Sequence, residues 1–310
     1  MKKYRLIVPL ILLAITAYCL RQTRKDAAAP DKKTETQSLR LALDSIISEV
    51  PGKVGIAIIN ATDTLTVNND FRYPMMSVFK LHQALAVSNQ LSGSTSGLDS
   101  LLTIFPEEID RETWSPVIGN HADTPFGITI GELLSASLIK SDNNASNLLF
   151  RHIVNQAATD SIVRSIAVDT EFAIRYSESQ MKRDHSLSYD NNTTPLAAAT
   201  LIFQLLTDDL TGVPHKDQII KMLSQVDTGH DRIAAGLTEY SGAKLWHKTG
   251  SGYRNDRGEL TAHNDVGFIR LPDGRKFALA ILICDFDGTE EEASALIAEI
   301  TSTVAADWKR

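Results

Sequence analysis

Hydrophobic and polar positions follow a helical spacing in some stretches of the chain and a strand-like pattern in others. Residues 38–50 carry Leu and Ile at a helical spacing that a Pro-Gly pair ends. Residues 53–60 and 64–70 are β-branched runs on either side of a short turn, which predicts a hairpin. From residue 77 to about 240 the spacing is mostly helical, with loops rich in Gly, Pro, Asn and Asp. The chain therefore predicts a helix, a hairpin and then a long helical region.

The C-terminal part returns to strand-like patterns. Residues 244–251, 264–271 and 276–286 predict three strands, and the Pro-Asp-Gly sequence at 272–274 is typical of a hairpin turn. Residues 289–308 begin with Thr and three Glu, which favour the start of a helix. The two ends of the chain thus predict strands and helices that can pack together.

These elements predict an α+β fold. We expect the strands of both ends to form one antiparallel sheet, flanked by the N- and C-terminal helices, with an all-helical lobe inserted between them. Residues 38–308 would be a single domain, with an α/β lobe at 38–76 and 241–308 and a helical lobe at 77–240. A cleft between two lobes is a common place for a site.

The N-terminus reads as a targeting segment. Three basic residues within the first five positions precede the apolar run 6–20, which is short for a membrane span. Residues 21–37 are polar and predict a tether, so residues 1–37 would be an export segment and tether. We expect a periplasmic protein. The fate of the segment stays open between an ordinary signal peptide, an uncleaved membrane anchor and lipidation at Cys19.

Composition narrows the classes of function. The formal net charge of -7 argues against a nucleic-acid-binding surface. The two cysteines, Cys19 and Cys284, do not predict an internal disulfide because Cys19 lies in the targeting segment. The eight histidines show no ligand spacing, so we expect no metal.

Ser77 and Lys80 open the apolar stretch "MMSVFKLHQALAV" and are the first candidate for chemistry. They are one helical turn apart and share a face, on a helix that is apolar almost all round and therefore predicted to be buried. A buried lysine needs a partner. A serine hydroxyl is a weak nucleophile that needs an adjacent base, and an amine can serve where burial and a second cation favour its neutral form.

Two more motifs follow at element boundaries. Ser141-Asp142-Asn143 comes after a predicted helix, and Lys248-Thr249-Gly250 lies on the strand 244–251. Each motif alone has an ordinary explanation, since the first caps a helix and the second is a common strand end. Together, in this order and on these elements, the three motifs can face one cleft.

Elementary chemistry gives each side chain a role. Lys248 would be the second cation, and Ser141 would carry a proton to a leaving nitrogen. Asn143 would hold a substrate carbonyl or Lys80, and Thr249 would bind a substrate carboxylate. The backbone N–H groups of Ser77 and Ser251 would form an oxyanion hole, worth about 2.7–4 kcal/mol per donor.

With these three motifs the chain resembles the class A serine β-lactamases and, more distantly, the penicillin-binding proteins. The resemblance covers residues 38–308. It implies a β-lactamase/DD-peptidase-like fold and hydrolysis of the β-lactam amide of cephalosporins and penicillins through an acyl-enzyme on Ser77. It also implies a small-molecule substrate, no cofactor and a monomer.

Class A enzymes use a glutamate to activate the water that frees the serine. The resemblance points to Glu178, in the loop before Thr-Thr-Pro195, at the family's spacing. Glu171 is the rival and lies further upstream than that spacing allows. Lys80 and Glu178 would share the role of base in acylation.

The same loop departs from the commonest family pattern. Tyr176 stands where many members have a loop-clamping arginine, and Lys182 stands where an asparagine usually helps hold the water. These substitutions, and His247 before Lys248, resemble the divergent branch of extended-spectrum and cefuroxime-hydrolysing cephalosporinases. How the loop is held is therefore an open question at this point.

Three further residues are candidates for substrate binding. Arg232, in a Thr-Gly-x-x-Arg-Ile context, is our choice for the substrate carboxylate, with Arg254 as the alternative. Trp114 matches an aromatic at the pocket rim in the family, although an ordinary partly buried Trp would look the same in the sequence.

Two other functions remain as alternatives. A penicillin-binding protein or DD-peptidase would use the same three motifs without a glutamate that frees the serine. A non-catalytic cell-wall or β-lactam-binding protein could share the fold. The presence of Ser77, Lys80 and Glu178 argues against the second alternative.

Overall fold

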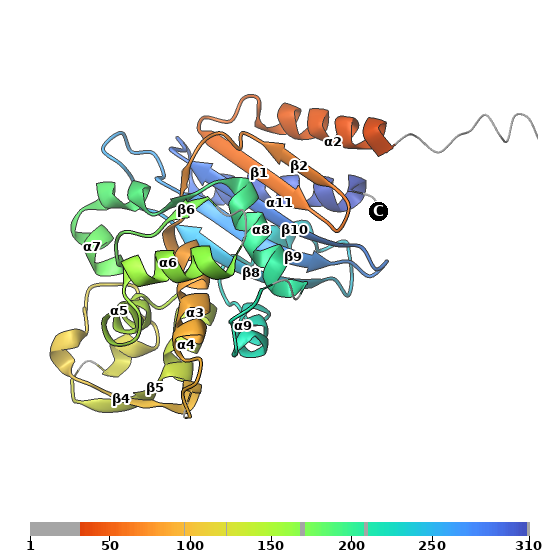
Figure 1. Ribbon diagram of the computed structural model, residues 1–310. Helices are drawn as coiled ribbons and strands as arrows, with labels where there is room; N and C mark the ends of the chain where they lie inside the picture. Colours follow the sequence, from red (N-terminus) through yellow and green to blue (C-terminus); the bar gives the residue numbers. More distant parts are fainter. Residues whose placement is uncertain (1–31, 96, 122, 168–170, 208–209, 309–310) are drawn as a thin grey trace, which may run out of the picture.

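The computed structural model describes residues 32–95, 97–121, 123–167, 171–207 and 210–308 (Figure 1). The export segment predicted at the N-terminus, with Cys19, lies outside these residues apart from the end of its tether. Within the described residues, no helix is both long and apolar enough to cross a membrane.

A five-stranded antiparallel sheet joins the two ends of the chain, as predicted. Its order is β2-β1-β10-β9-β8, and β1 pairs with β10 in the centre. The strands are β1 (Lys53–Ile59), β2 (Thr64–Val67), β8 (Lys244–Ser251), β9 (His263–Arg270) and β10 (Lys276–Cys284). Since β10 is buried on both faces, its apolar residues form a continuous run rather than an alternating one.

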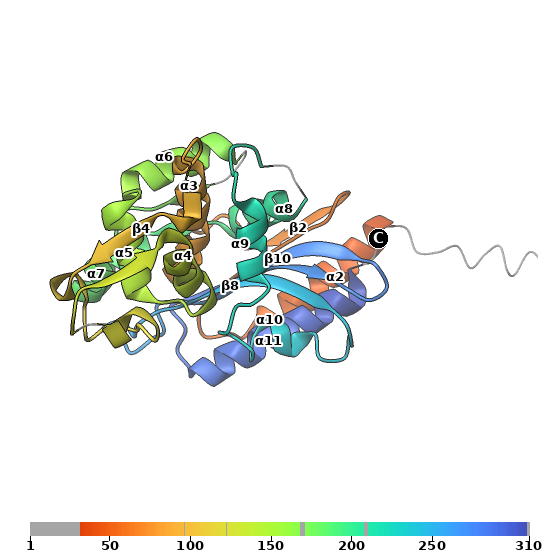
Figure 2. The same ribbon diagram turned by 90° about the horizontal axis from the view of Figure 1, so that it is seen from below.

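Two terminal helices cover one face of the sheet, also as predicted. They are α2 (Lys32–Ile47) and α11 (Glu290–Asp307), and both lie on the same side of the strands (Figure 2). Ile56, Ile58 and Ile281 face these helices, and their neighbours in sequence face the other way. The prediction was wrong at one boundary: residues 32–37 belong to α2 rather than to a tether. Lys, Glu and Gln are good helix formers even where they provide no apolar periodicity.

The opposite face carries α8 and the second lobe. Helix α8 packs on β1, β9 and β10. The helices of this region are α3 (Phe79–Gln90), α4 (Ile130–Ile139), α5 (Asn143–His152), α6 (Gln156–Ile166), α7 (Glu178–Arg183), α8 (Pro195–Leu206) and α9 (Lys216–Leu223). Helix α10 (Ile233–Gly236), which the prediction placed in the helical lobe, instead packs on α11 on the other side of the sheet, where Ile233 joins the core.

The second lobe also contains short strands, so it is not all-helical as predicted. These strands are β3 (Tyr73–Pro74), β4 (Leu101–Ile104), β5 (Phe126–Thr129), β6 (Phe172–Ala173) and β7 (Asn192–Thr193). Each is two to four residues long, which is too short to show a clear period-2 pattern in the sequence.

Helix α3 is the central helix of the second lobe. Residues 79–88 are buried, and the helix contacts α4, α5, α6 and α9. This explains its apolar character all round. A 3₁₀ turn, η1 (Met76–Val78), joins it to β3 and lies against β8. The start of α3 is therefore fixed at the boundary between sheet and lobe.

Candidate active site

A cavity of 790 Å³ lies between the sheet and the helical lobe. Side chains from η1, α7, β8 and the loops around α5 line it, among them Ser77, Ser141, Asn143, Glu178 and Thr249. The structure thus brings the three sequence motifs and the predicted glutamate to one place.

The buried amine of Lys80 lies at the centre of the site. Its Nζ donates to Ser77 Oγ at 3.0 Å, to Asn143 Oδ1 at 2.7 Å and to the Ser141 carbonyl oxygen at 2.8 Å. It also lies 2.9 Å from Glu178 Oε1. Lys80 is therefore a partnered buried cation rather than one that extends to water.

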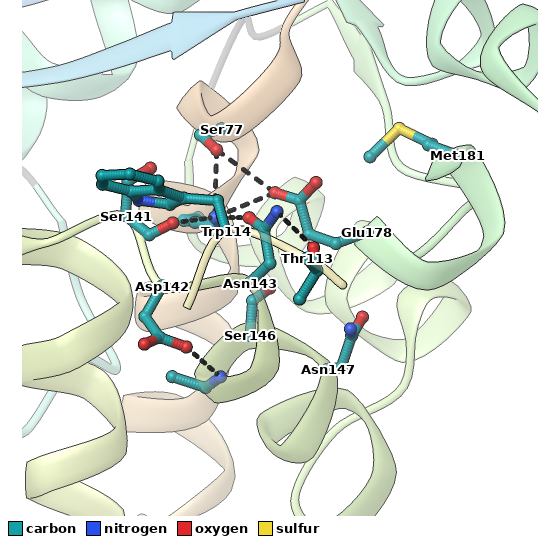
Figure 3. A network of polar contacts seen from close by, with 12 residues as sticks. Ser77, Thr113, Trp114, Ser141, Asp142, Asn143, Ser146, Asn147, Glu178 and Met181 are labelled. Atoms are coloured by element: carbon teal, nitrogen blue, oxygen red, sulfur yellow. Dashed lines mark hydrogen bonds and ion pairs between the residues drawn. The ribbon is translucent and has the colours of Figure 1, made fainter. Parts of the chain in front are cut away.

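Glu178 is also buried and reaches the serine directly. Ser77 Oγ donates to Glu178 Oε1 at 3.2 Å, and Figure 3 shows the two side chains pointing toward each other. Glu178 is the first residue of α7, whose start is capped reciprocally by Ser177 and Gln180. The rival Glu171 is exposed and pairs with Arg72 outside this cavity.

Ser141 and Lys248 form a second hydroxyl–amine pair. Lys248 Nζ donates to Ser141 Oγ at 3.0 Å. Burial, and then the nearby positive charge of Lys80, lower the pKa of Lys248 well below its ordinary value. Each reactive hydroxyl in the cavity therefore has an amine in hydrogen-bond contact.

Backbone strain occurs beside both hydroxyls. Met76, immediately before Ser77, has a φ of 46°, and Ser141 itself has a φ of 56°. Residues other than glycine rarely adopt these left-handed values, and such strain is concentrated at functional sites.

Close packing against η1 requires a glycine at position 250. A Cβ at this position would lie 2.3 Å from the Met75 carbonyl oxygen and 3.3 Å from the Ser77 backbone nitrogen. Glycine therefore lets β8 approach η1, which brings the Ser77 N–H close to the strand edge that carries Ser251.

The structure distinguishes the two arginine candidates. Arg232 is buried at the cavity wall, where its Nη2 donates to Ser251 Oγ at 2.6 Å and its Nη1 to the Asn264 carbonyl oxygen at 2.8 Å. Arg254 donates to the carbonyl oxygens of Gly258 and Gly288 outside this cavity. Arg232 is thus the cation beside Ser251.

Trp114 lies at the rim of the cavity. Its side chain is 61% exposed, and its Nε1 donates to the Lys140 carbonyl oxygen at 3.0 Å. The structure therefore favours the rim position over an ordinary partly buried tryptophan.

Sequence reasoning missed the supporting residues. Thr113 Oγ1 accepts from Asn143 Nδ2 at 2.9 Å, and Thr228 Oγ1 lies 2.6 Å from Thr249 Oγ1. Neither residue type stands out in a sequence. The sequence predicted no separate role for Asp142, the middle residue of its motif.

Asp142 holds several segments together. Its fully buried carboxylate accepts from the Ala145 backbone at the start of α5, from Ser115 Oγ and from the backbone of Val117 and Ile118. The N-cap position before α5 was a signal that could have identified this role.

The loop that carries Glu178 is held differently from the family pattern. Asn191 Oδ1 accepts from the backbone N–H groups of Arg175 and Tyr176, and its Nδ2 donates to the Tyr176 carbonyl oxygen. This buried amide fixes the loop where many family members use an arginine. Lys182 pairs with Asp110.

Comparison with known proteins agrees with this site. Residues 38–308 match the model of the beta-lactamase enzyme family. A beta-lactamase from Phocaeicola vulgatus is 40% identical, over 96% of this chain and 92% of that protein. The crystal structure of the TLA-1 extended-spectrum beta-lactamase is 30% identical with a TM-score of 0.84, over 89% and 99% of the chains. A class A beta-lactamase structure from Bacteroides cellulosilyticus is 28% identical with a TM-score of 0.81, over 88% and 98%.

Proposed function

The chain belongs to the beta-lactamase enzyme family and is a class A serine β-lactamase, and we propose how its residues divide the reaction. Ser77 is the nucleophile that attacks the lactam carbonyl. The observation that carries the proposal is the buried Glu178 Oε1, 3.2 Å from Ser77 Oγ and 2.9 Å from Lys80 Nζ. A general base within hydrogen-bond reach of the nucleophile is what both halves of the reaction need.

Acylation requires a group to take the Ser77 proton. Ser77 Oγ donates to Glu178 and accepts from Lys80, so the resting geometry favours Glu178 as the first acceptor. Lys80 stabilises the attacking oxygen as this proton moves to Glu178. The backbone N–H groups of Ser77 and Ser251 stabilise the oxyanion. Ser141, in contact with Lys248, delivers a proton to the leaving nitrogen. The proton taken by Glu178 passes through Lys80 to replace the one that Ser141 gave, so Glu178 is a carboxylate again before deacylation.

Deacylation reuses Glu178 after the leaving nitrogen has departed. Its carboxylate takes a proton from a water molecule that attacks the ester on Ser77, and the proton returns to Ser77 Oγ as the ester bond breaks. Asn143 is hydrogen-bonded to Lys80 and to Thr113, and these protein–protein contacts position Lys80 without help from the substrate. This second use of Glu178 separates a β-lactamase from a penicillin-binding protein.

Substrate binding centres on the edge of β8. We assign the carboxylate shared by penicillins and cephalosporins to Thr249, Ser251 and Arg232, with Trp114 at the rim. We also propose a preference for extended-spectrum cephalosporins, because the sequence departs from the common loop pattern and a structural relative carries the extended-spectrum description. Such an activity would confer resistance to these antibiotics.

Replacing Arg232 with Ala is expected to raise KM for a cephalosporin by about 10-fold or more, with a smaller fall in kcat. A charge-assisted hydrogen bond is worth about 1.5–3 kcal/mol, and this one is present in both ground and transition states. Steady-state kinetics would measure both parameters, with Arg232→Lys as a variant that keeps the charge and Arg254→Ala as a control. The same KM signature in Arg254→Ala alone would show that the carboxylate binds elsewhere.

Turnover of a chromogenic cephalosporin tests the overall function. Sustained hydrolysis is the expected result. A single stoichiometric burst would instead indicate a penicillin-binding protein, and no reaction would indicate a non-catalytic binder. The family and structural matches favour neither alternative.

We further propose that the protein is exported to the periplasm and acts as a monomer. The basic residues and apolar run within residues 1–20 support export. Cell fractionation, with the N-terminal mass of the recovered protein, would distinguish cleavage, lipidation at Cys19 and a retained anchor. Light scattering of the protein lacking residues 1–31 would test the monomer.

A further inference from the structure

An ion pair lies beside the active-site cavity, close to Glu178: Lys182 lines the cavity, and its partner Asp110 lies outside the lining. Lys182 lies one turn after Glu178 on α7, so both side chains leave the same face of the helix. Lys182 Nζ lies 2.9 Å and 3.0 Å from the two carboxylate oxygens of Asp110 and 3.7 Å from Glu112. The charged partners of Lys182 are thus Asp110 and Glu112 rather than Glu178.

Asp110 is a fixed anchor for this contact. Its backbone N–H donates to Asn144 Oδ1 at 2.9 Å, and its carbonyl oxygen accepts from Asn144 Nδ2 at 2.9 Å. Asn144 is fully buried and follows Asn143 on α5. Helix α5 therefore holds Asp110 through Asn144 and contacts Lys80 through Asn143.

The ion pair between Lys182 and Asp110 is charged at neutral pH and partly exposed to solvent. Burial alone would raise the pKa of Asp110, but hydrogen bonds from Lys182 and from the Glu112 backbone lower it below its ordinary value. Asp110 therefore stays ionised throughout the neutral and mildly acidic range. The side chains of Lys182 and Asp110 are 26% and 30% exposed, so salt can screen the pair.

Helix α7 needs support beyond its own hydrogen bonds because it has only six residues. Asn191 fixes the backbone before it, and Asn147 Oδ1 accepts from the Ser179 N–H. Beyond its end, His185 stacks on Tyr253 with ring centroids 3.6 Å apart. Gln180 on α7 also accepts from Gln156 Nε2 at 3.2 Å. The Lys182–Asp110 pair therefore adds a charged contact, at the last turn of α7, to the hydrogen bonds that join this helix to the helical lobe.

We propose that Lys182 is a positioning residue, and that its ion pair with Asp110 tethers α7 to the segment fixed by Asn144 and holds Glu178 in line for deacylation. This rests on the proposed role of Glu178 as the base. A misplacement of about 1 Å can reduce a rate about 100-fold, whereas a partly exposed ion pair contributes little to stability.

Pre-steady-state kinetics on matched variants test the tether. Lys182→Met and Asp110→Asn should each slow deacylation by about 10- to 100-fold and produce a burst, with acylation changed much less. The double variant should be no slower than either single variant, because both remove one contact. Lys182→Arg should restore deacylation. Thermal unfolding should barely change in any variant.

Two controls complete the experiment. Arg183→Met removes an equal charge from an exposed neighbouring position of α7 and should leave deacylation unchanged. Raising NaCl from 50 mM to 1 M should slow deacylation in the unmodified enzyme but not in Lys182→Met, because only the former has a pair to screen.

Each contrary result has its own meaning. Slow deacylation in Lys182→Met together with a normal rate in Asp110→Asn would overturn the tether and show that Lys182 acts directly on Glu178 or the water. Normal rates in both variants, with a trapped adduct in Glu178→Gln, would overturn the tether and leave the base assignment standing. Full turnover in Glu178→Gln would instead overturn the proposed role of Glu178 as the base.

Discussion

Glu178→Gln is expected to turn the enzyme into one that binds a β-lactam covalently and then stops. Glutamine keeps the shape of the side chain but removes the base. An ester on serine reacts slowly with unassisted water, and general-base help is worth about 10²–10⁴-fold. Deacylation should therefore fall by about that factor.

Acylation should fall less than deacylation in this variant. Lys80 remains 3.0 Å from Ser77 Oγ and can take over the proton, and Ser141 with Lys248 still protonates the leaving nitrogen. The acyl-enzyme then accumulates. Stopped-flow absorbance should show a stoichiometric burst, and intact-protein mass spectrometry should show the adduct on Ser77.

Glu171→Gln is the matched control, since it makes the same change in an exposed glutamate that pairs with Arg72. It should turn over normally. Full turnover in Glu178→Gln alongside a trapped adduct in Glu171→Gln would mean that the base has been misassigned.

Ser77→Ala is expected to abolish covalent labelling by a penicillin and to reduce turnover by about 10⁶-fold, the scale of loss when a serine nucleophile is removed from a hydrolase. The fold should remain, because Ser77 Oγ contributes only its contacts with Lys80 and Glu178. Mass spectrometry after incubation with the penicillin would measure labelling, and circular dichroism would check the fold. An adduct that persists on another serine would overturn the assignment.

The sheet and its covering helices follow from periodicity because they bury one face or both. Residues 244–251 form β8 as predicted, and 289–308 contain α11. The first turns of α2 could not be predicted in the same way, since residues 32–37 carry helix-forming side chains without an apolar stripe. Strands such as β3 and β7 are only two residues long and are defined by their partners.

The motif residues could be predicted because their chemistry constrains residue type at close spacing. Ser77 and Lys80 are one turn apart, and Ser141 and Asn143 flank a helix start. The partners of these residues could not be predicted. Lys182 and Asp110 are 72 positions apart, and either charge alone is typical of a solvated surface. Only the fold brings them into contact beside the cavity.

The left-handed backbone at Met76 and Ser141 limits which substitutions this enzyme can accept during evolution. Each such residue costs about 1–3 kcal/mol, out of a total stability of only about 5–15 kcal/mol for a typical protein. Relaxing either residue would move a reacting hydroxyl, so this cost persists in every active descendant. Substitutions that adapt the cavity to a new antibiotic therefore occur in a protein whose free energy of unfolding is already reduced by this strain. Compensating substitutions are to be expected far from the cavity, in the sheet core and in the faces of α2 and α11.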